Sequence, residues 1–146
     1  MASWVEGNIG IKGNYEDLKN FLLNGLRLDN QEGNAISKTM DEETKILRVN
    51  GATSETVFFI DGTVLLVPWL GDDIEIIQSI DESQFSVVME IMVKWFISAG
   101  QLLDVAKKYH LDIRATGMNL DDKEHQDIII KGGKIVKDER FLLDDF

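Results

Sequence analysis

Two histidines and several groups of acidic side chains are the residues of this chain that could carry out chemistry. His125 lies in the segment Asp121–Asp127, which also contains three aspartates and a glutamate. Such a set could bind a metal ion, but calcium loops need an Asp-x-Asp-x-Asp-Gly pattern and a bidentate glutamate, and neither is present. A solvated loop is the favoured interpretation. His110 follows Tyr109 at the predicted end of a helix, where a charged imidazole interacts favourably with the helix dipole.

Sequence motifs for nucleophilic catalysis, phosphate binding and thiolate chemistry are missing. No Gly-x-Ser-x-Gly occurs, and nothing places either histidine beside a serine that it could activate. The segment Gly7–Gly13 is glycine-rich but lacks the lysine and threonine that end a phosphate loop. The chain has no cysteine, which excludes disulfides, thiolate metal sites and cysteine nucleophiles. Adjacent carboxylates such as Asp72-Asp73 would point to opposite faces of a strand and act together only in a turn. We therefore expect a protein that is not an enzyme, with no catalytic residue, cofactor or metal.

The clearest signal is a stretch of 45 residues, Val49–Val93, with eight acidic residues and no lysine or arginine. The whole chain has 26 acidic and 15 basic residues and a net charge of -11. A surface with one sign of charge attracts partners of the opposite sign. Nucleic acids and anionic membranes require lysine and arginine, so we predict a basic protein partner, with no direct nucleic acid and no membrane. Solubility alone is the alternative explanation of the acidity.

The segment Pro68–Asp73 places a tryptophan next to acids at a predicted strand-to-turn tip. Aromatic side chains anchor protein interfaces, and acids steer a basic surface toward them. Asp73 and Glu75 are two positions apart, about 6.6 Å on a strand, which is near the repeat of nucleic-acid phosphates. The predicted partner-binding residues are Trp69, Asp72, Asp73, Glu75, Asp81 and Glu82. The competing interpretations are a solvated sheet face for the acids and core packing for Trp69, as for Trp4 and Trp95.

Hydrophobic periodicity and turn residues predict a strand-rich chain with two helices. The expected strands are Trp4–Gly13, Ile46–Asn50, Thr56–Ile60, Thr63–Trp69, Leu111–Gly117, Asp127–Lys131 and Lys134–Val136. Ile74–Ile80 is expected to be a strand or a short helical turn. Phe85–Trp95 is compatible with a helix or a strand, and its β-branched residues favour a strand. The expected helices run from the Asn14 cap to Gly25 and from the Ser98 cap to Tyr109. Asp61-Gly62 and Gly132-Gly133 are expected hairpin turns, and Pro68 is expected at a strand end or edge. Leu26–Glu43 is predicted to be an irregular loop, and Asp138–Phe146 an acidic, apolar tail.

The length of 146 residues fits one domain. The first residues, Met1–Glu6, lack the basic and apolar regions of a signal peptide. The longest apolar run without a charge, Val64–Gly71, is far too short to cross a bilayer. These features predict a cytoplasmic protein.

Two segments resemble a family of phage and prophage proteins with a YubB-type ferredoxin-like domain. The first is Ala2–Asn8 with the strand and helix that follow it. The second runs from Trp95-Phe96-Ile97-Ser98 through Ala106–Tyr109 and the strand Leu111–Arg114 to the hairpin at Gly132-Gly133. Together they cover about half of the chain. The family often has prolines where this chain has Ile97-Ser98-Ala99, and the resemblance does not extend to residues 26–85.

The resemblance implies a small accessory protein of a mobile element, acting in the host cytosol, and it gives no catalytic residue. The order of elements predicts an α+β fold: a ferredoxin-like antiparallel sheet with two helices on one face and a β-rich insertion. Residues 1–25 and 86–137 would form the core of one domain, residues 26–85 the insertion and residues 138–146 the tail.

The predicted function is inhibition of a basic, nucleic-acid-handling host defence protein, such as a CRISPR effector nuclease, by an acidic surface that imitates nucleic acid. The first alternative is a module that binds or sequesters a small nucleotide signal. The second is a structural or assembly protein that forms a homodimer through its apolar tail, Phe141–Phe146.

Overall fold

The computed structural model describes residues 3–28, 36–69, 71, 73–80 and 83–142, which form twelve strands, two α-helices and a π-helical turn. The strands are β1 (Trp4–Gly13), β2 (Leu26–Leu28), β3 (Ser37–Asp41), β4 (Ile46–Asn50), β5 (Val57–Ile60), β6 (Leu66–Pro68), β7 (Ile74–Glu75), β8 (Ile77–Gln78), β9 (Phe85–Lys94), β10 (Asp112–Asn119), β11 (Glu124–Lys131) and β12 (Lys134–Leu142). The helices are α1 (Tyr15–Asn20), which continues as the π-helical turn η1 (Phe21–Gly25), and α2 (Ala99–Tyr109).

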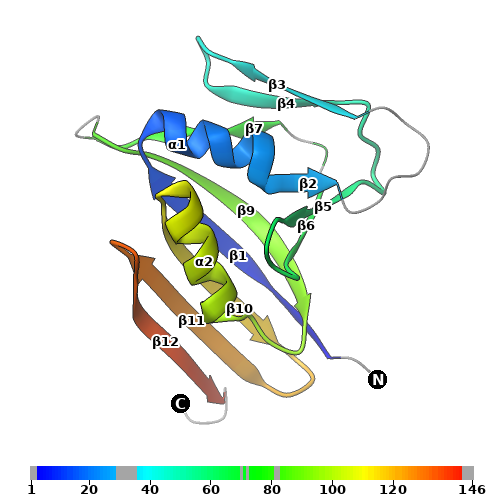
Figure 1. The fold of residues 1–146 in the computed structure, drawn as a ribbon. Helices are drawn as coiled ribbons and strands as arrows, with labels where there is room; N and C mark the ends of the chain where they lie inside the picture. The colour runs from blue at the N-terminus through cyan, green and yellow to red at the C-terminus, as the bar shows by residue number, and fades with distance from the viewer. Residues whose placement is uncertain (1–2, 29–35, 70, 72, 81–82, 143–146) are drawn as a thin grey trace.

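A twisted antiparallel sheet of nine strands forms the body of the molecule (Figure 1). Its strands follow the order β12-β11-β10-β1-β9-β6-β5-β2, and β8 pairs with β9 in addition. A separate sheet, β3-β4-β7, lies at the top of the view in Figure 1. The centre of the large sheet is the long pair β1 and β9, whose register runs from Trp4 opposite Lys94 to Gly13 opposite Phe85.

The two faces of the large sheet differ because side chains alternate along each strand. Ile9 and Ile11 on β1 are buried under the helices, as are their counterparts on β9, β10 and β11. Figure 1 shows α1 and α2 over this same face. The opposite face, which carries the side chains of Asn8, Lys12 and Val88, has no helix on it. We call it the open face.

Both predicted helix starts are confirmed by their caps. The side chain of Asn14 accepts a hydrogen bond from the backbone N–H of Asp17 at 2.8 Å, and Ser98 caps α2 through the N–H of Gln101 at 3.2 Å. Such caps satisfy N–H groups that have no partner within the helix. Gly25 ends η1 in a tight place, since a Cβ there would lie 2.8 Å from the ring of Phe21.

The small sheet is tied to α1 and η1 by side chains. Glu42, in the β3–β4 turn, accepts hydrogen bonds from the hydroxyl of Tyr15 and the amine of Lys19. The amine of Lys38 on β3 donates to the backbone oxygens of Leu22, at 2.7 Å, and of Leu26. These contacts hold the β3–β4 hairpin against the end of the first helical segment.

The predicted ferredoxin-like α+β fold is wrong. Of the described residues, 53% are in strands and 17% in helices, and nine strands share one sheet. The physical reason lies in residues 26–85. We expected a β-rich insertion on a smaller core, but β2, β5, β6 and β8 join the same sheet as β1 and β9 and continue its hydrogen bonding.

Several local expectations are confirmed and two are wrong. Pro68 is the last residue of β6, β5 and β6 pair across the turn that contains Asp61-Gly62, and residues 85–94 form a strand. The expected loop Leu26–Glu43 is wrong where it contains β2 and β3, because these short strands gain their hydrogen bonds from β5 and β4. The expected tail is wrong up to Leu142, which belongs to β12; residues 143–146 lie outside the described residues. In the described part of the chain no helix is long and apolar enough to span a membrane.

Candidate functional site: an acidic slot beside strand β9

A break in the large sheet creates a cavity beside β9. On the side away from β1, β9 pairs with β8 at Ile77 and Ser86 and with β6 at Leu66 and Met92. Between these two pairs, no described strand is hydrogen-bonded to this edge of β9. A cavity of about 420 Å³ opens there, and we call it the acidic slot. Its lining residues are Asn8, Phe58, Val67, Pro68, Trp69, Asp73, Ile74, Glu75, Ile77, Val88, Met89 and Glu90.

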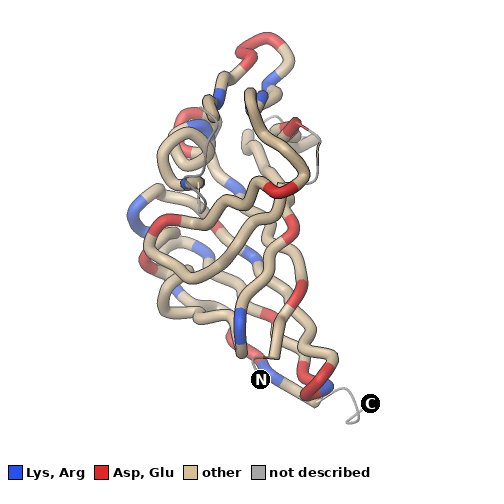
Figure 2. Tube along the Cα trace, turned by 90° about the vertical axis from the view of Figure 1, so that its right-hand side faces the viewer, with Lys and Arg blue, Asp and Glu red and all other residues tan. Residues whose placement is uncertain are grey.

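Three carboxylates define the charge of the acidic slot. Asp73, Glu75 and Glu90 are exposed at its border, and no lysine or arginine lines it. Among the described residues, none forms an ion pair or side-chain hydrogen bond with them. Figure 2 shows how acidic and basic positions are distributed over the trace, and in the sequence residues 49–93 include acids and no lysine or arginine. The slot therefore combines a negative border that no cation neutralises with an apolar interior. This combination favours the binding of a cationic group carried on an apolar chain, as in lysine and arginine side chains.

Not every acid of the basic-free stretch contributes to this charge. Asp61, in the β5–β6 turn, lies 3.5 Å from Arg27 and 3.3 Å from Lys108, and both cations come from outside the stretch. The carboxylate of Asp61 is thus neutralised by the fold, whereas the three at the slot are not. The acids of the stretch therefore divide into structural and available groups, a division that the sequence alone does not show.

Trp69 forms an aromatic wall of the slot. Its backbone N–H donates to the oxygen of Thr56 at 3.0 Å, which continues the β5–β6 ladder one residue beyond Pro68. The side chain is half-buried and packs against the core, so the core-packing interpretation is confirmed in part, and the anchor role stays a prediction. Buried Phe58, Val67 and Met89 line the interior.

The structure brings three of the six predicted partner-binding residues to one cavity. Trp69, Asp73 and Glu75 line the slot, whereas Asp72, Asp81 and Glu82 lie outside the described residues. Sequence reasoning missed Glu90 and Asn8, which face each other across the β1–β9 pair. The alternation of β9 places Glu90 on the open face, but only the three-dimensional pairing brings it beside Trp69.

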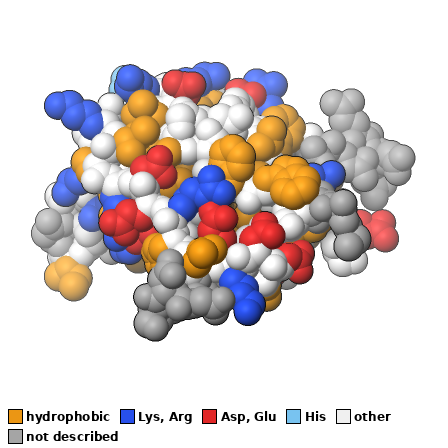
Figure 3. Space-filling view, turned by 90° about the horizontal axis from the view of Figure 1, so that it is seen from below, with side chains coloured by type: hydrophobic (Ala, Val, Ile, Leu, Met, Phe, Trp, Pro, Cys, Tyr) orange, Lys and Arg blue, Asp and Glu red, His pale blue; other side chains and the backbone are white. Residues whose placement is uncertain are grey.

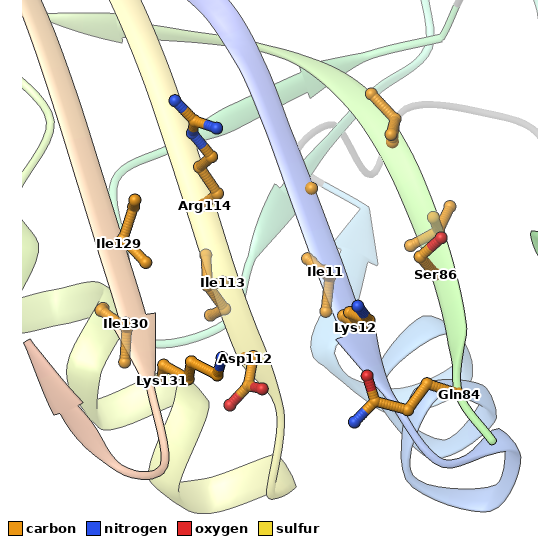
Figure 4. A pocket seen from close by; sticks show the side chains of 13 residues that line it. Ile11, Lys12, Gln84, Ser86, Asp112, Ile113, Arg114, Ile129, Ile130 and Lys131 are labelled. Atoms are coloured by element: carbon orange, nitrogen blue, oxygen red, sulfur yellow. The ribbon is translucent and has the colours of Figure 1, made fainter. Parts of the chain in front are cut away.

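A second depression lies on the open face on the other side of Val88, which lines both cavities. We call it the basic groove; its volume is about 440 Å³. Its charged lining residues are Lys12, Arg114, Lys131 and Asp112, and its floor is at Gly10, which has no side chain. Figure 4 shows Lys12, Arg114 and Lys131 on three different strands, with Asp112 next to Lys131.

Part of the charge at the basic groove is compensated by the fold. The guanidinium of Arg114 donates to the carboxylate of Asp127 at 3.2 Å, and Lys137 donates to it at 2.9 Å. Burial alone would raise the pKa of Asp127, but these hydrogen bonds and charges hold that pKa below its ordinary value. Asp112 accepts from the N–H of Gly132 at 3.0 Å. Among the described residues, neither Lys12 nor Lys131 has an ion-pair partner, so these two lysines are the least compensated cations of the groove.

Among the described residues, neither histidine forms an ion pair or a side-chain hydrogen bond with an acid, a serine or a threonine. His110 is the left-handed C-cap of α2, with φ of 59°, and is exposed. His125 on β11 packs against Phe141, with ring centroids 4.8 Å apart. The predicted solvated loop Asp121–Asp127 is a turn only in its first part, where the backbone N–H of Asp122 donates a hydrogen bond to Oδ1 of Asn119 at 3.1 Å. Residues Glu124–Asp127 belong to β11. Within the described ranges, no three histidine, aspartate or glutamate side chains are placed to hold a metal ion.

Trp4 and Trp95 are exposed at the end where β1 begins and β9 ends, so their expected core packing is wrong. The amine of Lys94 lies 5.5 Å from the ring of Trp4, and Arg140 lies 5.3 Å from the ring of Phe96. Figure 3 views the molecule from this end and shows hydrophobic side chains interspersed with both signs of charge. This end has aromatic surface but no single sign of charge, which distinguishes it from the acidic slot.

Comparisons with protein-family models, with curated proteins and with solved structures found no match for this chain. The resemblance to the YubB-type phage and prophage family therefore stays a prediction.

Proposed function

We propose that this protein acts by binding a basic protein surface through the acidic slot. One observation carries the proposal: Asp73, Glu75 and Glu90 border a cavity that contains Trp69, and no lysine or arginine lines it. Carboxylates on a folded, partly apolar cavity attract cations more strongly than carboxylates on a flat solvated face, because the local dielectric constant is lower.

A lysine or arginine side chain of the partner matches the chemistry of the slot. Its apolar stem would pack along Trp69 and Pro68, and its charged head would lie among the three carboxylates. Arginine would gain more than lysine, since a guanidinium can bind a carboxylate with two hydrogen bonds and stack on an aromatic ring. No step in this mode of action requires a catalytic group or a cofactor.

The partner class that we propose is a basic, nucleic-acid-handling host defence protein, such as a CRISPR effector nuclease. Support comes from the net charge of -11 and from the slot, which together would compete with nucleic acid for a lysine- and arginine-rich groove. The phage or prophage origin, and with it the host cytoplasm as the place of action, rests on the family resemblance alone.

The experiment is capture of proteins from a bacterial lysate on three immobilised forms of the chain. The first is the wild type. The second is the slot-reversed variant, Asp73→Lys, Glu75→Lys and Glu90→Lys. The third is the control-reversed variant, in which three exposed acids away from the slot are changed: Glu43→Lys, Asp104→Lys and Asp138→Lys.

Both variants change the net charge by the same amount, so only the location of the change differs. We expect a basic protein to be retained by the wild type and the control-reversed variant, to be lost from the slot-reversed variant, and to be displaced by added DNA. Equal retention by all three forms, or equal loss from both variants, contradicts the proposal. Circular dichroism checks that each variant is folded.

The basic groove favours a second candidate function, the binding of a small anionic ligand such as a nucleotide signal. Lys12, Arg114 and Lys131 could contact phosphates, while Ile129 and Val88 offer an apolar surface to a base. A nucleotide that binds the folded state would raise the melting temperature without any protein partner. The test measures the melting temperatures of the wild type and of Lys12→Glu with a series of nucleotides. The candidate function requires that a nucleotide raise the melting temperature of the wild type and leave that of Lys12→Glu unchanged.

A further inference from the structure

We infer that the open face of the large sheet is a self-complementary surface, on which a second copy of this chain binds as a two-fold symmetric dimer. The inference goes beyond the proposed function, and either can hold without the other. It concerns the basic groove and the acidic slot together, because the two cavities meet at Val88 on one continuous face.

Charge on the open face is divided into two halves. Lys12, Arg114 and Lys131 border the groove on one side of Val88, and Asp73, Glu75 and Glu90 border the slot on the other. The fold compensates Arg114 through Asp127, but no described residue forms an ion pair with Lys12 or Lys131, although the chain has a net charge of -11. A second copy supplies both an acidic surface for the cations and a basic surface for the acids.

The boundary between the halves is apolar and exposed. Val88 has 65% of its surface exposed, and Ile77, whose neighbour Ser86 places it on the same face, has 56%. Apolar side chains at the centre with charges around them match the arrangement of protein interfaces. A standard interface takes about 800 Å² from each partner, roughly a tenth of the 8560 Å² surface of this chain.

The arrangement of strands permits the required symmetry. In a two-fold dimer the same patch is used twice, and each residue type meets its complement across the axis. An axis that lies within the interface, along the boundary between β1 and β9 near Val88, brings the groove of each copy over the slot of the other. The two sheets would then pack face to face as in a β-sandwich, with nearly aligned strands.

Such a dimer would fill the acidic slot with the chain's own cations. The dimer and a foreign basic partner would therefore exclude one another. The dimer would dissociate and expose the acidic slot on dilution, or when a basic surface that binds more strongly competes for it.

The test measures molecular mass by sedimentation equilibrium from micromolar to millimolar protein, at low and high salt. It uses the wild type, the slot-reversed variant and a groove-reversed variant, Lys12→Glu and Lys131→Glu. The matched control is Lys107→Glu and Lys108→Glu, two exposed lysines on α2, which covers the other face of the sheet. We expect the wild type and the control to dimerise, less so at high salt. Each reversed variant alone should be a monomer, because reversal brings like charges of the groove and the slot opposite one another.

The decisive sample is an equimolar mixture of the slot-reversed and groove-reversed variants. In it, the lysines of the reversed slot meet the glutamates of the reversed groove, and the unchanged groove meets the unchanged slot. We expect a one-to-one heterodimer. Three results overturn the inference: a wild type that stays monomeric throughout the range, a dimer that neither reversal weakens, or a mixture that remains monomeric. A monomeric wild type that still binds a basic peptide would assign the slot to a foreign partner alone, and so would separate this inference from the proposed function.

Discussion

Gln126 and Ile97 are joined by two hydrogen bonds inside the core. The backbone N–H of Ile97 donates to Oε1 of Gln126 at 2.7 Å, and Nε2 of Gln126 donates to the oxygen of Ile97 at 3.1 Å. Both residues are buried. The pair attaches the segment between β9 and α2 to strand β11. It therefore helps to set the position of β9, the strand that borders the acidic slot.

Replacing Gln126 should therefore destabilise the fold. In Gln126→Ala, a buried N–H and a buried oxygen lose their partners, and we expect a loss of about 2–4 kcal/mol in the free energy of unfolding. Gln101→Ala is the comparison, since Gln101 accepts a single bond from the exposed Val64 N–H, which water can replace. Its loss should be about 1 kcal/mol or less. Urea denaturation measures both, and similar losses would contradict the account of the buried pair.

Two glycines of β1 should respond to alanine in opposite ways. A Cβ on Gly7 would lie 1.9 Å from the backbone oxygen of Thr116, whereas the nearest atom to a Cβ on Gly10 is 4.0 Å away. Gly7→Ala should cost more than about 2 kcal/mol, because β10 would have to move. Gly10→Ala should be neutral or stabilising by up to about 1 kcal/mol. Thermal unfolding of both variants tests this, and a tolerated Gly7→Ala would contradict the close β1–β10 approach.

Asp127 should make the fold sensitive to acid. Its folded pKa lies below its ordinary value, despite burial, because Lys137 and Arg114 bind the carboxylate. A group with a lowered folded pKa stabilises the fold above its unfolded pKa of about 3.9, and that contribution is lost as the pH falls through the folded value. The difference in the free energy of unfolding between the wild type and Asp127→Asn, measured by urea denaturation from pH 7 to pH 3, should decrease below about pH 4. A difference that is constant with pH would contradict the prediction.

Lys38 should give a pH dependence of the same sign, a stability that rises with pH, at the basic end of the scale. Burial, with a smaller contribution from the charge of Arg27, lowers the pKa of Lys38 from 10.5 to about 8. Between those values the unfolded chain holds the proton and the folded chain does not, so stability rises with pH. Wild type should gain stability relative to Lys38→Met between pH 7 and pH 9.5, as measured by urea denaturation. An unchanged or falling difference would indicate an ordinary lysine.

Local patterns were sufficient to predict much of this fold. The alternation of Val5, Ile9 and Ile11 predicted β1 with its observed bounds, and the Asn14 and Ser98 caps predicted both helix starts. These signals are carried by neighbours in the sequence. The strands β2 and β3 were missed because they are short and partly polar, and only their partners β5 and β4 make them strands.

The overall architecture and the slot depend on pairings that no local pattern contains. Sequence reasoning identified Trp69, Asp73 and Glu75 as a group, since they are close along the chain. It did not add Glu90, which reaches the same cavity from β9, nor did it predict the gap between β6 and β8 that makes the cavity. Strand order is a long-range property, and the family resemblance directed the expectation toward a smaller sheet.

The central claim is that the location of the acids at the slot, rather than the total charge, selects a basic partner. The most direct measurement is the fluorescence anisotropy of a labelled arginine-rich hexapeptide, titrated at low salt with micromolar wild type, slot-reversed variant and control-reversed variant. The account predicts that the wild type and the control-reversed variant bind with Kd values within about threefold, and that the slot-reversed variant binds at least about tenfold more weakly, a loss of about 1.4 kcal/mol or more. Equal weakening in the two variants would show that net charge alone attracts the peptide and would contradict the claim.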